Sequence, residues 1–138
     1  MKKPTIHKSI IARLAVVFLF CFAFSAQTEA YDGIDFYGCK LSAKDRVNSA
    51  GKRLNTIRDI LAQDRANVHK FGKRDQSDEK DRYCTTATKR QIFQKARINI
   101  SAELFKKILA GKDVEVTVYI LDKETIDVHA GLPDPNVS

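Results

Sequence analysis

The first 30 residues carry the pattern of an export signal, which decides how much of the chain folds into the mature domain. A basic leader precedes an unbroken apolar run of 11 residues, Leu14 to Phe24, and a short polar stretch then ends at Ala30. A helix that spans a membrane needs roughly 20 apolar residues, so the run is too short for a permanent anchor. We therefore expect cleavage after Ala30, with Ser25 as the alternative, and a periplasmic or secreted mature protein of residues 31–138.

The mature chain is long enough for one domain with one modest hydrophobic core. It contains two cysteines, Cys39 and Cys84, and thiols pair by default in an oxidising compartment. We therefore expect a disulfide bond between them that stabilises the fold. A disulfide bond between two chains is the alternative. Neither cysteine has a second cysteine close in sequence, as a redox motif would require.

A seven-residue apolar repeat predicts a long amphipathic helix from Ser42 to Phe71. The repeat consists of Val47, Leu54, Leu61 and Val68. Ser42 and Asp45 match a capping box at its start, and Gly72 is a suitable stop. The same row leaves open a coiled-coil contact with a second chain.

The cysteines limit how straight this helix is. A straight helix from Ser42 to Phe71 is about 45 Å long, and the chain from Phe71 to Cys84 spans at most about 44 Å when fully extended. The chain could then bring Cys84 back to Cys39 only if the segment from Phe71 to Cys84 were almost fully extended. We therefore expect a shorter or bent helix, with the break near Gly51.

The remaining segments predict a small sheet and shorter helices. Arg97 to Ile100 and Val114 to Leu121 have the β-branched, alternating pattern of strands, and Ser101 caps a helix that Gly111 ends. Further expected features are a brief strand or extended arm at 31–38, a solvated loop at 73–82, a short helix around Ile92 and a loose end after Gly131. The predicted fold is α+β, with one long helix and shorter ones on an antiparallel sheet.

Residues that suggest catalysis or metal binding are few. His69 and His129 are the histidines of the mature chain, and a pair of this kind could serve as acid and base in a hydrolase of nuclease type. Nothing in the sequence places them together. The acidic residues between 75 and 81 lack the ligand spacing of a calcium loop, so we assign no catalytic residue, metal or other cofactor.

Charge is distributed unevenly along the chain. Residues 40 to 111 carry 18 basic and 8 acidic side chains, whereas residues 112 to 138 carry 2 basic and 6 acidic ones. We expect a basic face of the long helix, formed by Lys52, Arg53, Arg58 and Arg65, to bind an acidic protein partner. Interspersed acidic residues leave an ordinary solvated surface as the alternative. The few aromatic residues form no stacking platform, which argues against nucleic acid as the partner.

The leading functional hypothesis is an exported, disulfide-bonded protein-binding module, such as an inhibitor, an immunity protein or an accessory of envelope assembly. The absence of a recognisable catalytic motif in the sequence favours a binding protein over an enzyme. One alternative is a small secreted hydrolase that uses His69 or His129. Another is a cationic factor that acts on membranes.

Overall fold

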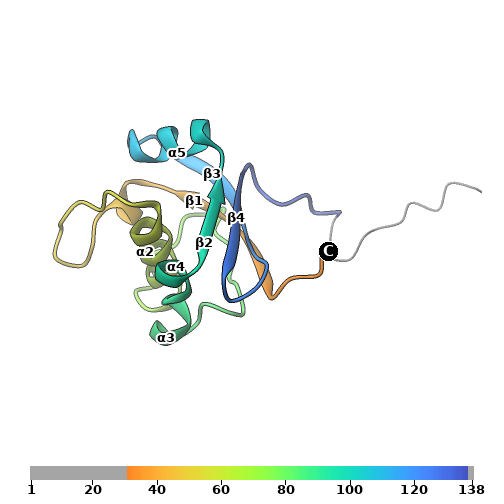
Figure 1. Cartoon of the computed structure of the whole chain (residues 1–138). Coiled ribbons are helices and arrows are strands. Elements are labelled where there is room, and N and C mark those ends of the chain that lie inside the picture. The colour runs from red at the N-terminus through yellow and green to blue at the C-terminus, as the bar shows by residue number, and fades with distance from the viewer. Residues whose placement is uncertain (1–30, 137–138) are drawn as a thin grey trace, which may run out of the picture.

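The computed structural model describes residues 31–136, so the predicted export signal lies outside the described residues. The chain forms an α+β fold in which helices pack against one face of a four-stranded sheet (Figure 1). The strand order is β1-β3-β4-β2. β3 is antiparallel to β1 and to β4, whereas β2 runs parallel to β4. The sheet is therefore mixed, and the predicted purely antiparallel sheet is wrong, because the chain crosses from β2 through a helix before it forms the β3–β4 hairpin.

The strands are β1 (Asp35–Leu41), β2 (Arg97–Ile100), β3 (Val114–Ile120) and β4 (Thr125–Ala130). The α-helices are α2 (Ile57–His69), α3 (Ala87–Arg90), α4 (Ile92–Lys95) and α5 (Ala102–Leu109), and η1 (Ala43–Arg46) is a single 3-10 turn. β2, α5 and β3 occupy their predicted positions. β4 was not predicted, because its two inward residues, Ile126 and Val128, give too short an alternation to stand out. Within residues 31–136, no helix has the length and apolar character needed to cross a bilayer.

The long helix predicted from Ser42 to Phe71 is broken near Gly51, as expected, although the disulfide bond on which that expectation rested is absent. Gly51 has a φ of 75°, in the left-handed region that favours glycine, and its N–H donates to the carbonyl of Asn48 at 2.9 Å. This tight turn separates η1 from α2. Thr56 then caps α2 by accepting the Asp59 N–H at 3.1 Å, and Gly72, with a φ of 63°, follows its end.

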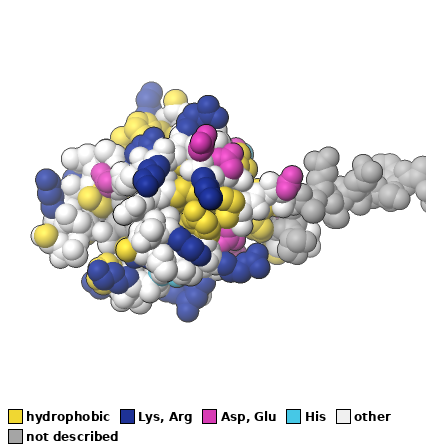
Figure 2. Space-filling model, turned by 60° about the horizontal axis from the view of Figure 1, so that its bottom comes forward, with side chains coloured by type: hydrophobic (Ala, Val, Ile, Leu, Met, Phe, Trp, Pro, Cys, Tyr) yellow, Lys and Arg dark blue, Asp and Glu magenta, His cyan; other side chains and the backbone are white. Residues whose placement is uncertain are grey.

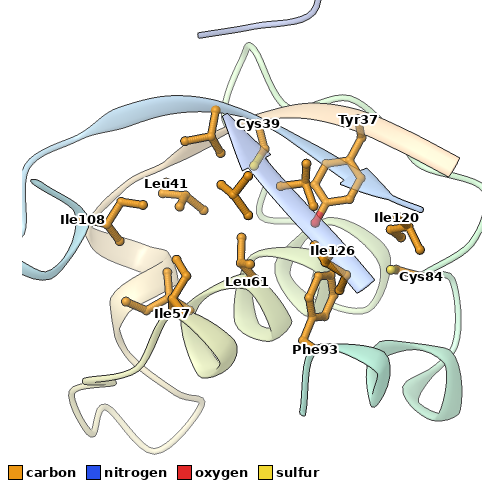
Figure 3. Packing of buried hydrophobic residues seen from close by; sticks show 14 of the residues in the cluster. Tyr37, Cys39, Leu41, Ile57, Leu61, Cys84, Phe93, Ile108, Ile120 and Ile126 are labelled. Atoms are coloured by element: carbon orange, nitrogen blue, oxygen red, sulfur yellow. The ribbon is translucent and has the colours of Figure 1, made fainter. Parts of the chain in front are cut away.

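The core lies between α2 and the inner face of the sheet (Figure 3). Ile57, Ile60 and Leu61 of α2 are buried there against strand and helix residues such as Leu41, Phe93, Ile108 and Ile126. Because the apolar side of α2 is used within its own domain, it offers no heptad seam to a second chain. Val47 lies outside the helix altogether.

The loop between α2 and α3 covers the outer edge of β1. The Gly38 N–H donates to the Glu79 carboxylate at 2.6 Å, and the Glu79 N–H donates to the Gly38 carbonyl at 2.9 Å. The Lys40 N–H donates to the carboxylate of Asp78, which is 1% exposed, at 2.9 Å. The expectation of a solvated loop is thus wrong for Asp78, because this acidic segment satisfies backbone groups that an edge strand would leave open.

Cys39 and Cys84 are free, buried thiols, so the structure does not contain the predicted disulfide bond. Cys39 points inward from β1, whereas Cys84 follows the loop that seals this strand. Figure 3 shows the two cysteines on either side of the Tyr37 ring. Burial raises the pKa of both thiols, which keeps them protonated and poorly nucleophilic.

We expect both cysteines to react with iodoacetamide in the unfolded protein and to resist it in the folded one. The mature protein would be purified without reductant and its mass measured after alkylation with and without denaturant. Uptake at both thiols only in denaturant agrees with the structure. An unfolded protein that takes up no reagent and is lighter by two hydrogens would contradict it.

Candidate functional site

Arg65, predicted to bind a partner, lies in the interior of the fold. Its side chain is fully buried, with Nε 2.7 Å from Asp64 Oδ2 and Nη1 3.1 Å from Asp81 Oδ1. The guanidinium carbon also lies 3.8 Å from the centre of the Tyr37 ring. The partner-binding prediction for Arg65 is therefore wrong. The 73–84 loop folds over this side of α2 and brings Asp81 to it.

Arg58 is also held within the domain. Its Nη1 donates to the carbonyls of Phe93 at 2.9 Å and Ala96 at 2.6 Å, and so ties α2 to the end of α4. Lys52 and Arg53 remain exposed, in the turn before α2. The four predicted basic residues thus do not form one face. Figure 2 likewise shows Lys and Arg side chains dispersed over the visible surface without one continuous basic patch.

We expect replacement of Arg58 by Ala to lower the free energy of unfolding by about 1–3 kcal/mol, because two carbonyls lose their donor. Lys52→Ala is the matched control and should change it by less than about 0.5 kcal/mol, since Lys52 is an exposed turn residue. Urea unfolding followed by circular dichroism gives both values. Equal effects of the two substitutions would refute the structural role of Arg58.

Asp64 and Asp81 flank Arg65 but have opposite pKa shifts. Burial raises the pKa of Asp64 to about 7, against the opposing effect of the Arg65 guanidinium. Burial also acts to raise the pKa of Asp81, but hydrogen bonds from His69 and the Cys84 N–H outweigh it and lower the value. Asp64 binds its proton more tightly in the folded chain than in the unfolded one. Its contribution to stability is therefore full below pH about 4 and is lost as the pH rises towards 7.

We expect Asp64→Asn to remove this dependence on pH. The free energy of unfolding of the variant, relative to the native sequence, should increase between pH 5 and pH 8, because the neutral amide carries no charge to bury. Urea unfolding at the two pH values measures the difference. A variant that loses relative stability over this range would instead show that an ionised Asp64 stabilises the fold.

His69 and His129 lie on different sides of the sheet. His69, at the end of α2, has Nε2 2.5 Å from Asp81 Oδ1, within the buried network around Arg65. His129 lies on the outer face of β4, where its ring centre is 5.4 Å from that of Tyr119. The fold therefore does not bring the two histidines together as an acid–base pair.

A hollow between η1 and α2 brings together side chains that the sequence did not connect. It has a volume of about 290 Å³ and is lined by Lys44, Val47, Asn48, Ser49, Gln63, Asn67, Phe71 and Lys73. We refer to it as the η1–α2 hollow. The sequence did not predict it, because both Val47 and Phe71 were assigned to the apolar side of one long helix from Ser42 to Phe71. The glycines at 51 and 72, which end the regular structure on either side, were the available signal.

Hydrogen bonds fix the polar part of the η1–α2 hollow. The Asn67 amide nitrogen donates to Asp45 Oδ1 at 2.8 Å, which joins α2 to η1. The Gln63 amide nitrogen donates to Asn67 Oδ1 at 2.9 Å. Asn67 is buried, so these side chains form a rigid part of the lining.

Two exposed apolar side chains, Val47 and Phe71, also line the η1–α2 hollow, and each is 38% exposed. Lys44 and Lys73 line the hollow beside them, and the sequence segments that carry Val47 and Phe71 are basic. Residues 47–53 and 70–74 contain Lys52, Arg53, Lys70, Lys73 and Arg74 but no Asp or Glu. Lys44 pairs with Asp75 at 2.9 Å, so the two charges offset each other and Lys73 is the lining cation outside this pair. An apolar surface beside Lys73 and these basic segments suits an acidic ligand that carries an apolar group.

Among residues 31–136, no group of three His, Cys, Asp or Glu side chains is placed to hold a metal ion. No protein-family model, curated protein or solved structure matches this chain. The function must therefore be inferred from the side chains and their surroundings.

Proposed function

We propose that this protein is an exported binding module that holds an acidic segment of a protein partner in the η1–α2 hollow. The observation that carries the proposal is that exposed Val47 and Phe71 line the hollow together with Lys73, while the sequence segments that carry them, 47–53 and 70–74, contain five basic residues and no acidic ones. An inhibitor, an immunity protein or an accessory of envelope assembly would each work through such a contact.

The two parts of the hollow have different roles in this proposal. Phe71 and Val47 contact an apolar side chain of the partner, and exclusion of water around such an anchor supplies most of the affinity of a small interface. Lys73, which lines the hollow, and the other cations of residues 47–53 and 70–74 attract the acidic residues on either side of that anchor. Electrostatic attraction of this kind mainly speeds association and makes it dependent on salt.

The two alternative functions receive less support from the geometry. A hydrolase with paired histidines would need His69 and His129 at one site, but they lie on different sides of the sheet. A cationic membrane factor would need basic and apolar side chains gathered on one broad face. The Lys and Arg side chains seen in Figure 2 are dispersed over the side shown, and Arg58 and Arg65 of the predicted basic face are held within the domain.

A photo-crosslinking amino acid at position 71 tests the proposal. Expressed with its export signal in the native host, the protein should form one discrete crosslink to a partner through position 71. Phe105 of α5 is the matched control position, since it is the same residue type, is 37% exposed and also lies beside lysines. We expect no equivalent crosslink there.

Charge reversal then distinguishes specific binding from nonspecific association. Lys73→Glu should reduce the crosslink at position 71, and added salt should have the same effect, because both weaken attraction to an acidic surface. Lys106→Glu, on α5, is the control and should leave the crosslink unchanged. Equal crosslinking from positions 71 and 105, or a yield insensitive to Lys73→Glu, would contradict the proposal.

A further inference from the structure

The two edges of the sheet are not equivalent. Loop carboxylates and backbone groups cover the outer edge of β1, whereas β2 pairs with β4 on one side only. The Arg97 N–H donates to the Glu124 carbonyl of the turn before β4 at 2.7 Å. This bond determines which residues of β2 direct their backbone N–H and C=O groups towards β4 and which direct them away from it. In a parallel ladder, the backbone groups of Ile98 and Ile100 then point away from β4.

Nothing within residues 31–136 satisfies these outward groups. The backbone N–H and C=O groups of Ile98 and Ile100 make no hydrogen bond with any described residue outside the β2–β4 ladder. In Figure 1, β2 lies towards the viewer and no ribbon passes in front of it. Ile98 and Ile100 are half-buried, while Arg97 and Asn99 on the other face of the strand are exposed. The free edge therefore has open backbone groups and partly exposed apolar side chains.

We propose that the free edge of β2 binds the β2 strand of a second copy of this protein, antiparallel and about a twofold axis that passes beside Asn99. In this register Ile98 of one copy lies opposite Ile100 of the other. These are the residues whose backbone groups point outward, so each such pair exchanges two hydrogen bonds. The two sheets join into one continuous sheet.

The side chains of β2 suit this self-pairing. Residues directly opposite each other in an antiparallel pair lie on the same face of the sheet, so Ile98 and Ile100 meet on the inner, apolar face. Asn99 lies opposite its own copy on the outer face, where two amides can bond to each other as donor and acceptor. A second copy therefore satisfies the edge without placing like charges opposite one another.

A cavity beside the strand supplies charge complementarity. It has a volume of about 500 Å³ and is lined by Asn99, Ile100, Ser101, Leu104, Asp127, Val128, His129 and Ala130. The Asp127 carboxylate accepts the Asn99 amide at 2.7 Å and makes no ion pair among the described residues. In the proposed register, Arg97 of the second copy lies opposite Ser101, at the mouth of this cavity. Its guanidinium can then reach towards Asp127.

Association of the purified mature protein tests this inference. Four-residue strands bury little surface, so we expect a reversible dimer with a dissociation constant in the micromolar range, on the order of 1–100 μM. Sedimentation velocity across this range should show monomer passing into dimer as the concentration increases. A protein that stays monomeric throughout would overturn the proposal.

Two variants locate the contact. Asn99→Lys places like charges opposite each other across the twofold axis and should weaken dimerisation at least about tenfold. Ile98→Pro removes an outward N–H without removing a bond to β4 and should have the same effect. Thr88→Lys, an equal charge change on exposed α3, is the control and should dimerise like the native sequence. Circular dichroism of each variant confirms that it folds.

The outcomes distinguish this edge from other contacts. Loss of the dimer in folded Asn99→Lys or Ile98→Pro, with Thr88→Lys unaffected, supports pairing through β2. A dimer that persists in both β2 variants must use another surface and overturns the proposal. Because binding in the η1–α2 hollow involves neither Asn99 nor Ile98, the crosslink at position 71 should survive in both variants.

Discussion

The buried guanidinium of Arg65 is the interaction on which the rest of this fold depends. It connects α2 to the 73–84 loop through Asp81 and the Glu79 carbonyl, which it contacts at 3.1 Å and 2.8 Å, and it lies against Tyr37 of β1. A buried charge is tolerated only when it is paired and hydrogen-bonded, and removal of one partner typically costs about 3–5 kcal/mol. Helix, sheet and loop are thus fixed relative to one another at one point.

Fixing this loop has consequences at two surfaces. Asp78 and Glu79 are positioned to seal the edge of β1, while Asp75 of the same loop pairs with Lys44 beside the η1–α2 hollow. The charge asymmetry along the sequence is partly resolved inside the domain as well. Asp113, from the acidic C-terminal part, pairs with Lys40 of β1 at 3.0 Å. The basic surface left over is therefore smaller than the sequence suggested.

Local patterns predicted the elements that local forces determine. Ser101 and Gly111 bound α5 as expected, and the β-branched run at 114–120 forms β3, because caps and alternation act over a few residues. The failures involve contacts between distant segments. The burial of Arg65 requires Asp81, 16 residues away, and the cap on β1 requires Asp78, 38 residues from Lys40. No periodic pattern in the sequence indicates such long-range contacts. Charged residues that are buried in the structure were therefore predicted to be solvated.

Amide hydrogen exchange of the dilute, monomeric protein tests most directly the central claim that one edge of the sheet is sealed and the other open. The amides of Gly38 and Lys40, bonded to Glu79 and Asp78, should be as well protected as those within the β1–β3 ladder. The amides of Ile98 and Ile100 should exchange rapidly. Fast exchange at Gly38 and Lys40, or strong protection at Ile98 and Ile100 in the monomer, would contradict the account.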